Sequence, residues 1–427
     1  MEMAKMENNE IKNSKLIPRL RFPGFEGEWD ERPLGKVCDT ILVGFPFKGQ
    51  DITDDGTGHP ILRAYSIGEG VIRHGKDYDK YYPYDTKGLE KYKVKVGDIV
   101  ISMDGSVGRN IALVSKKEND YLLIQRVARL RITNYPIHMI YQQIISQRFK
   151  DYATGEKVGA VIAHISQKQI ESFPIYSPRT LPEQQKIASC LSELDNLIAA
   201  QGQKVDALKE KKKGLMQQLF PQPGETTPRL RFPGFEGEWE EKKLGEVANF
   251  QNGYAYNSSS FANNGDYVIR ISDIKSGTIS LKTAVHSSVN VPGAFKVVRG
   301  DILIAMSGAT TGKIGEYQSD EIAYINQRVG NIKPFDINKK LLLFLLQSDF
   351  FTCYLNGILT VGAQPNISSQ QICAFGFMLP PTEAEQQKIA SCLSSLDDLI
   401  AAESAKVEAL KDHKKGLMQQ LFPQPTK

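Results

Sequence analysis

The sequence contains no apolar run that could cross a membrane. The longest run, at residues 341–346 (LLLFLL), is far shorter than the roughly 20 residues that a membrane-spanning helix needs. The five cysteines are odd in number and lack the paired spacing that holds zinc, and the six histidines include no pair four residues apart on one helix. We therefore expect free thiols, no metal site and a cytoplasmic location.

An excess of charge of one sign is also missing. The 53 lysines and arginines and the 49 aspartates and glutamates leave a net charge of +4, which is too small to indicate nucleic-acid binding by itself. A composition of 41% apolar and 24% charged residues is typical of a folded globular protein. Residues 1–17 are polar and lack the apolar segment of a signal peptide, so they are predicted to form a disordered leader.

Two stretches of the chain are present twice. Residues 18–29 (PRLRFPGFEGEW) recur letter for letter as residues 228–239, and residues 183–192 (EQQKIASCLS) recur as residues 385–394. Most of the sequence between these stretches does not recur. The pattern predicts a scaffold with pseudo-two-fold symmetry that presents two different recognition surfaces.

The repeats divide the chain into alternating variable and constant parts. A segment rich in Pro, Gly and Thr at residues 221–228 indicates a short exposed linker between the halves. We predict a disordered leader (1–17), a first recognition domain (18–180), a central long helix (181–223), the linker with a second recognition domain (224–382), and a distal long helix (383–427).

The second constant block of each half predicts a long helix. From residue 182 to residue 219 apolar residues stand three or four apart, and the stripe is broken only at Gln201 and Lys212. The other copy is broken at the matching Glu403 and Lys414. So narrow a seam on about 57 Å of helix favours antiparallel pairing of the two copies, although each helix could instead pack on its own variable block. The residues predicted at the helix–helix interface are Ile187, Leu191, Leu194, Ile198, Val205, Leu208, Leu215, Ile389, Leu393, Leu396, Ile400, Val407, Leu410 and Leu417.

The variable blocks keep a weaker likeness. GDIVISMDGSVGR at residues 97–109 aligns with GDILIAMSGATTGK at residues 300–313, which indicates in each a turn, a short strand and a glycine-rich loop that ends in a cation. Gln-Arg-Val at residues 125–127 and Ile-Ser at residues 165–166 also recur. The two blocks are therefore predicted to share a mixed α/β fold, in an α+β protein, while differing in surface.

Several of these residues suit DNA, and each has a structural alternative. Glycine loops bring backbone amides and a cation such as Arg109 or Lys313 close to phosphate, but any tight turn also uses glycines. The Gln-Arg pairs could read base edges or end a strand. Arg63 and Arg270 could contact DNA or form a local ion pair. The loop at residues 308–313 lacks both the spacing and the Ser or Thr of a nucleotide-binding P-loop.

The order of these motifs resembles that of the specificity subunit of type I restriction-modification systems. The resemblance covers residues 18–422. Each half carries the PGFEGEW segment, GDI(V/L)I with its glycine loop, an IS..QI motif, and EQQKIA before a long helix. One departure concerns the residues before the shared Ile-Ser, which are Ile-Ala-His in the first block and Gln-Pro-Asn in the second.

The resemblance implies that each variable block reads one half of a split DNA target, and that the helices set the gap and dock two methylation subunits. Unlike loops, GSVGR against GATTGK, imply an asymmetric target. The DNA-contacting candidates that it implies are Arg63, Ser106, Arg109, Gln125, Arg126, Arg270, Thr310, Thr311, Lys313, Gln327 and Arg328.

The chain itself is not expected to be an enzyme. It lacks the Asn/Asp-Pro-Pro-Tyr/Phe tetrapeptide that the family's adenine methylation uses. The resemblance therefore implies that S-adenosylmethionine, ATP and magnesium act in the methylation and restriction subunits of the complex. Two alternatives remain: a two-headed protein-binding scaffold without DNA contact, and a hydrolase or methyltransferase with Asp98 or Asp301 as its catalytic residue. Both aspartates are predicted to be turn residues.

Overall fold

The computed structural model describes residues 16–155, 164–275, 277–359 and 365–424, so the predicted leader falls almost wholly outside the described residues. The chain divides into two compact units, Met1–Gln201 with Lys406–Lys427, and Gly202–Ala405. Each unit contains one variable block and one part of each of two long helices. We call these parts unit 1 with block 1 and unit 2 with block 2.

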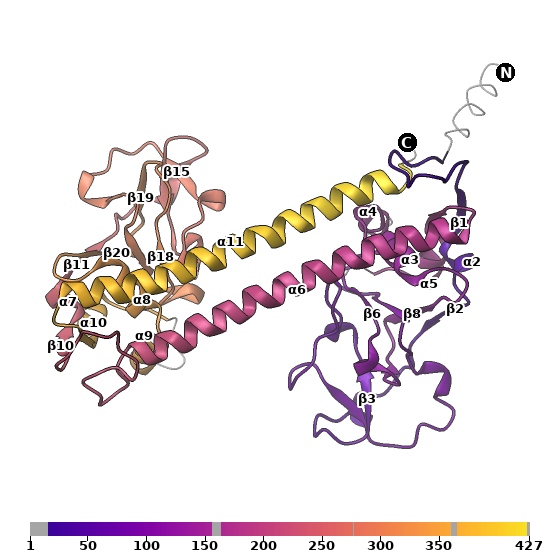
Figure 1. The fold of residues 1–427 in the computed structure, drawn as a ribbon, viewed down its shortest axis with the longest axis horizontal. Helices are drawn as coiled ribbons and strands as arrows, with labels where there is room; N and C mark the ends of the chain where they lie inside the picture. Colours follow the sequence, from indigo (N-terminus) through magenta and orange to yellow (C-terminus); the bar gives the residue numbers. More distant parts are fainter. Residues whose placement is uncertain (1–15, 156–163, 276, 360–364, 425–427) are drawn as a thin grey trace, which may run out of the picture. The chain divides into compact units, whose positions relative to one another are not determined.

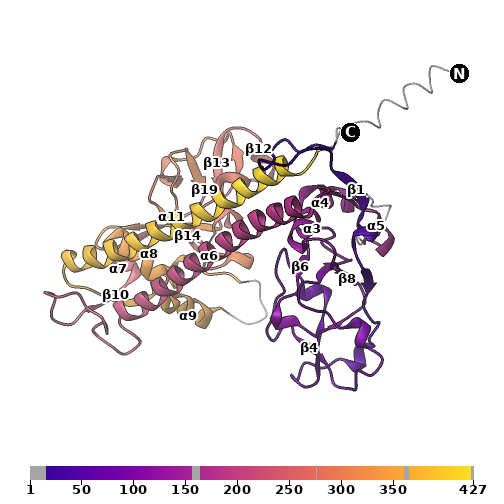
Figure 2. The same ribbon diagram turned by 45° about the vertical axis from the view of Figure 1, so that its right-hand side comes forward.

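The two long helices are α6 (Leu181–Leu219) and α11 (Glu383–Leu421), each of 39 residues. They confirm the helix predicted for residues 182–219 and its repeat. Within unit 1, Asp195 of α6 contacts Lys414 of α11, and Leu191 shares a core with Leu421. This order is antiparallel, and α6 and α11 lie side by side in both views of the ribbon (Figure 1 and Figure 2).

The polar breaks in the apolar stripe carry ion pairs between the helices. Lys414 lies 2.5 Å from Asp195 in unit 1, and Lys212 lies 2.7 Å from Asp397 at the matching position of unit 2. Glu403, which is buried, lies 2.9 Å from Lys204. A shift of one helix along the other would separate each carboxylate from its lysine. These pairs therefore favour a single register of the two helices.

Each of the predicted seam residues is buried or half-buried. However, the seam is not made by the helices alone. The start of each helix joins the core of the block that precedes it, Ile187 and Leu191 of α6 in block 1 and Ile389 and Leu393 of α11 in block 2. The far ends join the other block, with Met216 and Phe220 in the core of block 2 and Leu421 and Phe422 in that of block 1. Both arrangements that the sequence left open are therefore present: the helices pair with each other and also pack on the blocks.

The first constant segment connects the ends of both helices. In unit 1, the Arg21 guanidinium donates to the Glu183 carboxylate at the start of α6 at 2.8 Å, and the Leu20 amide donates to the Gln420 carbonyl near the end of α11 at 3.0 Å. In unit 2, the Arg231 guanidinium donates to the Glu385 carboxylate at 2.8 Å, and the Leu230 amide donates to the Gln218 carbonyl at 3.0 Å. This shared role explains why both constant stretches occur twice.

Block 1 is a mixed block with a four-stranded sheet in the order β2-β8-β5-β6 and a three-stranded sheet in the order β4-β3-β7, while β1 pairs with β9. Its elements are β1 (Asp30–Pro33), α2 (Leu34–Val37), β2 (Thr40–Val43), β3 (His59–Leu62), β4 (Lys80–Tyr82), β5 (Ile99–Ser102), β6 (Ile111–Leu113), β7 (Leu122–Leu123), β8 (Val127–Arg131), α3 (Ile137–Ile144), α4 (Gln147–Gly155), α5 (Gln167–Ser172) and β9 (Pro174–Ser177).

Block 2 repeats this plan with two five-stranded sheets, β11-β20-β17-β18-β14 and β12-β15-β13-β19-β16, and with the pair β10-β21. Its elements are β10 (Glu240–Lys243), α7 (Leu244–Val247), β11 (Ala248–Asn252), β12 (Phe261–Ala262), β13 (Asp266–Ile269), β14 (Gly277–Thr278), β15 (Val285–Ser287), β16 (Lys296–Val297), β17 (Ile302–Ala305), β18 (Ile314–Glu316), β19 (Ala323–Ile325), β20 (Val329–Pro334), α8 (Lys339–Gln347), α9 (Asp349–Ile358), α10 (Ser369–Cys373) and β21 (Gly376–Leu379).

The central strands β5 and β17 explain the shared GDI(V/L)I motif. Alternate side chains of a strand point to opposite faces, and here both faces are buried. Ile302 and Ile304 of β17 pack in the core that contains α8 and α9, whereas Leu303 and Ala305 pack in a second core on the other face. A strand buried on both faces needs a continuous apolar run, which is what both copies have.

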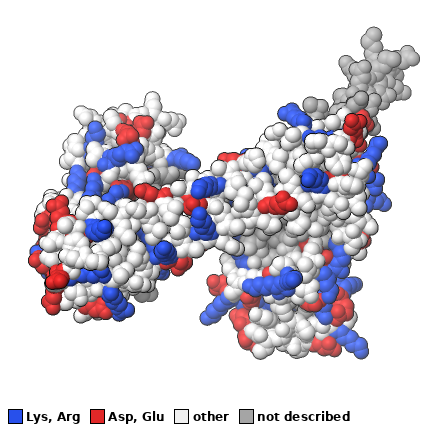
Figure 3. Space-filling view, viewed as in Figure 1, with Lys and Arg blue, Asp and Glu red and all other residues white. Residues whose placement is uncertain are grey.

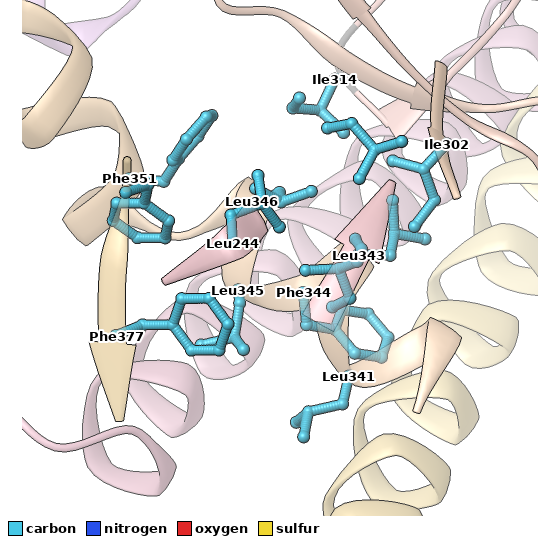
Figure 4. Close-up of a cluster of buried hydrophobic side chains, with 14 of the residues drawn as sticks. Leu244, Ile302, Ile314, Leu341, Leu343, Phe344, Leu345, Leu346, Phe351 and Phe377 are labelled. Carbon is cyan, nitrogen blue, oxygen red and sulfur yellow. The ribbon is translucent and has the colours of Figure 1, made fainter. Parts of the chain in front are cut away.

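The α8 run at residues 341–346 is the centre of the first of these cores. Figure 4 shows Leu341, Phe344 and Leu345 among side chains from neighbouring elements, including Phe377. Among the described residues, no single helix is long and apolar enough to span a membrane. The pair α8 and α9, which bends by 58°, passes that test only when the two helices are taken together.

Candidate nucleic-acid interface

Three segments of block 1 meet where strand β5 ends. The Met103 amide donates to the carbonyl of Arg126 at 2.9 Å, and the Ile165 amide donates to the carbonyl of Met103 at 2.9 Å. Asp104 and His164 form an antiparallel bridge beside these bonds. The glycine loop, the Gln-Arg turn and the Ile-Ser segment, three motifs that are distant in sequence, therefore form one surface feature, which we call the first junction.

Block 2 builds the same feature with the same backbone bonds. The Met306 amide donates to the carbonyl of Arg328, and the Ile367 amide donates to that of Met306, both at 2.9 Å. Ser307 and Asn366 form the bridge that Asp104 and His164 form in block 1. This second junction has the same backbone hydrogen bonds and the same bridge, with different side chains.

The exposed Gln-Arg pairs lie at the two junctions. Gln125, Arg126, Gln327 and Arg328 are exposed. The backbone N–H of Gln125 donates to the carbonyl of Phe45 at 2.9 Å. Of the candidates on the glycine loops, Ser106, Arg109 and Lys313 are exposed as well. Exposed amide and guanidinium groups on a rigid frame are suited to hydrogen bonding with base edges or phosphates.

The far ends of the glycine loops lie against helices. A Cβ added at Gly108 would lie 3.1 Å from the Lys150 Cα of α4, and one added at Gly312 would lie 2.7 Å from a Leu355 methyl carbon of α9. Both glycines also have positive φ angles, 76° and 81°, which side-chain residues rarely adopt. These glycines are therefore needed for packing against the helices, in addition to any role in binding phosphate.

Lys313 is the residue after Gly312. It lines a groove of about 820 Å³ in unit 2, together with Lys209, Lys212 and Lys340. The structure thus places Lys313 in a groove that residues of both long helices also line. The Thr311 hydroxyl donates to the Gly308 carbonyl at 2.6 Å, inside the loop. The Thr310 hydroxyl oxygen is buried and has no hydrogen-bond partner among the described residues.

For Arg270 the structure shows the local ion pair. Its Nε lies 3.5 Å from the Asp273 carboxylate, and its Nη2 donates to the Thr283 carbonyl at 2.8 Å. The short helix after it, Ile271–Asp273, contacts the glycine loop, because a Cβ on Gly308 would lie 3.3 Å from Ile271. The matching Arg63 is half-buried and shows no ion pair within the described part of the chain.

Asp98 and Asp301 are buried turn residues. The Asp98 carboxylate accepts from Arg131 at 2.7 and 2.8 Å and from the Lys95 amide at 2.7 Å. The Asp98 hydrogen bond raises the pKa of Arg131, whereas burial lowers the pKa of the neighbouring Arg129. Asp301 accepts instead from the neutral Asn331 amide at 2.8 Å. Both carboxylates are therefore engaged with the fold.

Two aromatic features of the blocks were missed by the sequence reasoning. Beside the Gln-Arg turn, Phe45 and Phe47 pack edge to face at 4.9 Å, as do Tyr254 and Tyr256 of block 2 at 5.0 Å. A Cβ on the preceding Gly44 would lie 2.1 Å from the Ile124 carbonyl oxygen, so the chain needs glycine there. The recurring pattern of glycine, aromatic, small residue and aromatic, GFPF and GYAY, was a usable signal.

The second missed feature is an exposed aromatic patch found in block 1. The Tyr65 and Tyr78 rings stack with centroids 5.3 Å apart, and the Arg73 guanidinium lies 5.8 Å from the Tyr78 ring centroid. Stacked aromatic rings with an arginine are a common platform for nucleic acids. On the face shown in Figure 3, lysines and arginines are interspersed with acidic residues over both blocks, in keeping with the small net charge.

The fold defines a protein with two units that have the same frame and unlike exposed surfaces, as expected of a two-headed recognition subunit. Residues 26–210 and 236–412 each match the family model of the type I restriction modification DNA specificity domain. These matches cover most of the chain, which therefore belongs to the family of type I restriction-modification specificity subunits. Members of this family are non-catalytic and provide sequence-specific DNA recognition.

Relatives and solved structures agree with this assignment. The type I restriction enzyme MjaVIII specificity subunit of Methanocaldococcus jannaschii is 28% identical over 373 residues, which are 81% of this chain and 86% of that protein. The putative MjaX specificity subunit of the same organism is 26% identical over 420 residues, 92% and 93% of the two chains. The crystal structure of a type I S subunit from M. genitalium has the same fold, with a TM-score of 0.56 at 16% identity over 96% of this chain and 100% of that one.

Proposed function

We propose that this chain reads a split, asymmetric duplex target, with block 1 and block 2 each reading one half-site. The observation that carries the proposal is the pair of junctions, which share their backbone bonds but differ in the side chains on them, Asp104 and His164 against Ser307 and Asn366. A common frame with different exposed groups is what two readers of unlike half-sites require. Matching half-sites would need matching side chains.

The helical frame is proposed to dock two methylation subunits. Identical partners need two alike surfaces, and the structure offers exposed leucines at matching positions of the repeats. Leu20 and Leu230 are 41% and 42% exposed, and Leu197 and Leu399 are 52% and 42% exposed. Restriction subunits then join through the complex, and S-adenosylmethionine, ATP and magnesium act in these partner subunits.

The full chain assembled with its methylation subunits provides the test. Duplex affinity should fall steeply with salt, because arginine and lysine contacts to phosphate release counterions. Mapping of methylated adenines should give a split motif, and exchange of residues 248–382 for another reader should change one half of that motif only. A scaffold without DNA contact predicts no salt-dependent binding of duplex, and a change in both halves of the motif would contradict one reader per half-site.

A further inference from the structure

We propose that Asp104 is a positioning residue of the first reader, which holds Arg126 and His164 together to recognise one G·C pair of the first half-site. The proposal rests on the proposed function and deepens it. It assigns a ligand, the major-groove edge of a single base pair, to three side chains of the first junction. It also explains why the second junction, with the same backbone hydrogen bonds, reads differently.

The Asp104 carboxylate uses a different oxygen for each partner. Its Oδ2 accepts from Nη1 of Arg126 at 2.8 Å, and its Oδ1 accepts from Nδ1 of His164 at 2.6 Å. A carboxylate only accepts hydrogen bonds, so Nδ1 of His164 carries the hydrogen. The carboxylate therefore fixes the orientation of the guanidinium and the tautomer of the imidazole at once.

The hydrogen-bonding groups of Arg126 and His164 that do not contact Asp104 match the edge of a G·C pair. The Arg126 side chain is 61% exposed, and its Nε and Nη2 hydrogens lie beyond the contact with Asp104. Arginine binds the O6 and N7 atoms of guanine through two such donors. In the neutral imidazole of His164, Nε2 is an acceptor, which matches the N4 amino group of the paired cytosine. Both bases of one pair are thus read by groups that one carboxylate aligns.

The backbone of Arg126 gives a second, independent indication. Arg126 has a φ of 68°, and Asp120 is the only other non-glycine residue with a positive φ in the described part of the chain. The left-handed region is sparsely populated by residues with a side chain, and such strain concentrates at functional sites. Arg328, at the matching position, does not share it. The first junction therefore has a backbone conformation at its arginine that the second junction lacks.

The second junction lacks the carboxylate. Ser307 stands where block 1 has Asp104, and Nη1 of Arg328 lies 3.4 Å from the amide oxygen of Asn366. A neutral amide at this distance holds a guanidinium less firmly than a carboxylate at 2.8 Å. Serine at position 104 is thus a natural test substitution, because this backbone frame already accepts it in block 2.

The experiment uses the full chain in complex with its methylation subunits and competition binding of the mapped target against duplexes changed at one pair at a time. D104S and D104N should reduce discrimination at one G·C pair of the first half-site by about tenfold, the scale of one bidentate arginine contact. R126A should remove discrimination at that same pair. Discrimination at all pairs of the second half-site should stay as in the unmodified chain.

A matched control removes an equal charge elsewhere in block 1. Asp151 lies on the exposed face of α4, where it accepts from Gln147 at 2.7 Å, so D151S reports the general effect of losing one negative charge. Full discrimination by D104S, or an even loss at every pair, would overturn the role of Asp104 while leaving DNA reading intact. If the unmodified complex binds no duplex, the proposed function itself fails, so the two failures are distinguishable.

Discussion

The structural role assigned to Asp98 predicts a large loss of stability when its charge is removed. Asp98 is 2% exposed and lies between Arg131, which it binds through both oxygens, and the buried Arg129, whose Nε lies 3.9 Å away. Asp98→Asn keeps the shape of the side chain but leaves two neighbouring arginines without their counter-charge. The equivalent Asp301 accepts from the neutral Asn331 side chain at 2.8 Å and from the Val298 backbone amide at 3.1 Å. The lysine nearest to it among the described ion pairs, Lys339, lies 3.9 Å away and is 42% exposed, so Asp301→Asn provides a control with a much weaker buried ion pair.

The expected magnitudes differ between the two variants. Removing one partner of a buried ion pair costs about 3–5 kcal/mol, and the lower end applies here because Arg131 is one-third exposed. Weakening one buried hydrogen bond between neutral and charged groups costs about 1–3 kcal/mol. The free energy of unfolding of unit 1 should therefore fall by roughly 3 kcal/mol in Asp98→Asn, clearly more than that of unit 2 in Asp301→Asn.

The two tryptophans make the assay specific to each unit. Trp29 is buried in the core of unit 1 and Trp239 in the core of unit 2. Urea denaturation followed by fluorescence in a Trp239→Phe background reports the first unit, and the same measurement in a Trp29→Phe background reports the second. Equal losses in the two units, or a loss below about 1 kcal/mol for Asp98→Asn, would refute the charge-neutralising role.

Further predictions concern docking, the helix seam and phosphate contact. Leu197→Glu and Leu399→Glu should each remove one of two bound methylation subunits without loss of fold, which native mass spectrometry counts; retention of both would contradict the docking surface. Lys212→Asp should lower the melting temperature by about 2–4 °C, with recovery on adding Asp397→Lys, and a lack of recovery would count against this register. Arg109→Ala should reduce the slope of log affinity against log salt by about one without changing the target motif, and an altered motif would indicate base contact instead.

The long helices were predictable because an apolar period of three to four residues determines both the element and its buried face. The polar breaks were visible at Lys212 and Lys414, but their partners Asp195 and Asp397 were not, since the sequence does not give the alignment of two helices. Helix ends were also hard to interpret. Met216 and Phe220 follow the same stripe as the seam, yet they pack into block 2.

The junctions were only partly predictable, for a different reason. Arg126 and Arg328 were found because the Gln-Arg pair recurs in both blocks. Asp104 was not singled out, because its partner His164 lies 60 residues away and the second block has neither residue. A cluster whose members are distant in sequence and change between repeats leaves no recurring pattern, so the fold is needed to bring it together.

The distribution of buried charge explains why the frame is constant while the readers differ. Glu183 and Glu385 are about 1% exposed and depend on Arg21 and Arg231, so a change in either constant segment leaves a buried carboxylate unpaired. By contrast, the junction arginines are exposed, and exposed substitutions usually change stability by less than about 0.5 kcal/mol. Substitution at the junctions can therefore change the DNA sequence that is read without threatening the helical frame that both units share.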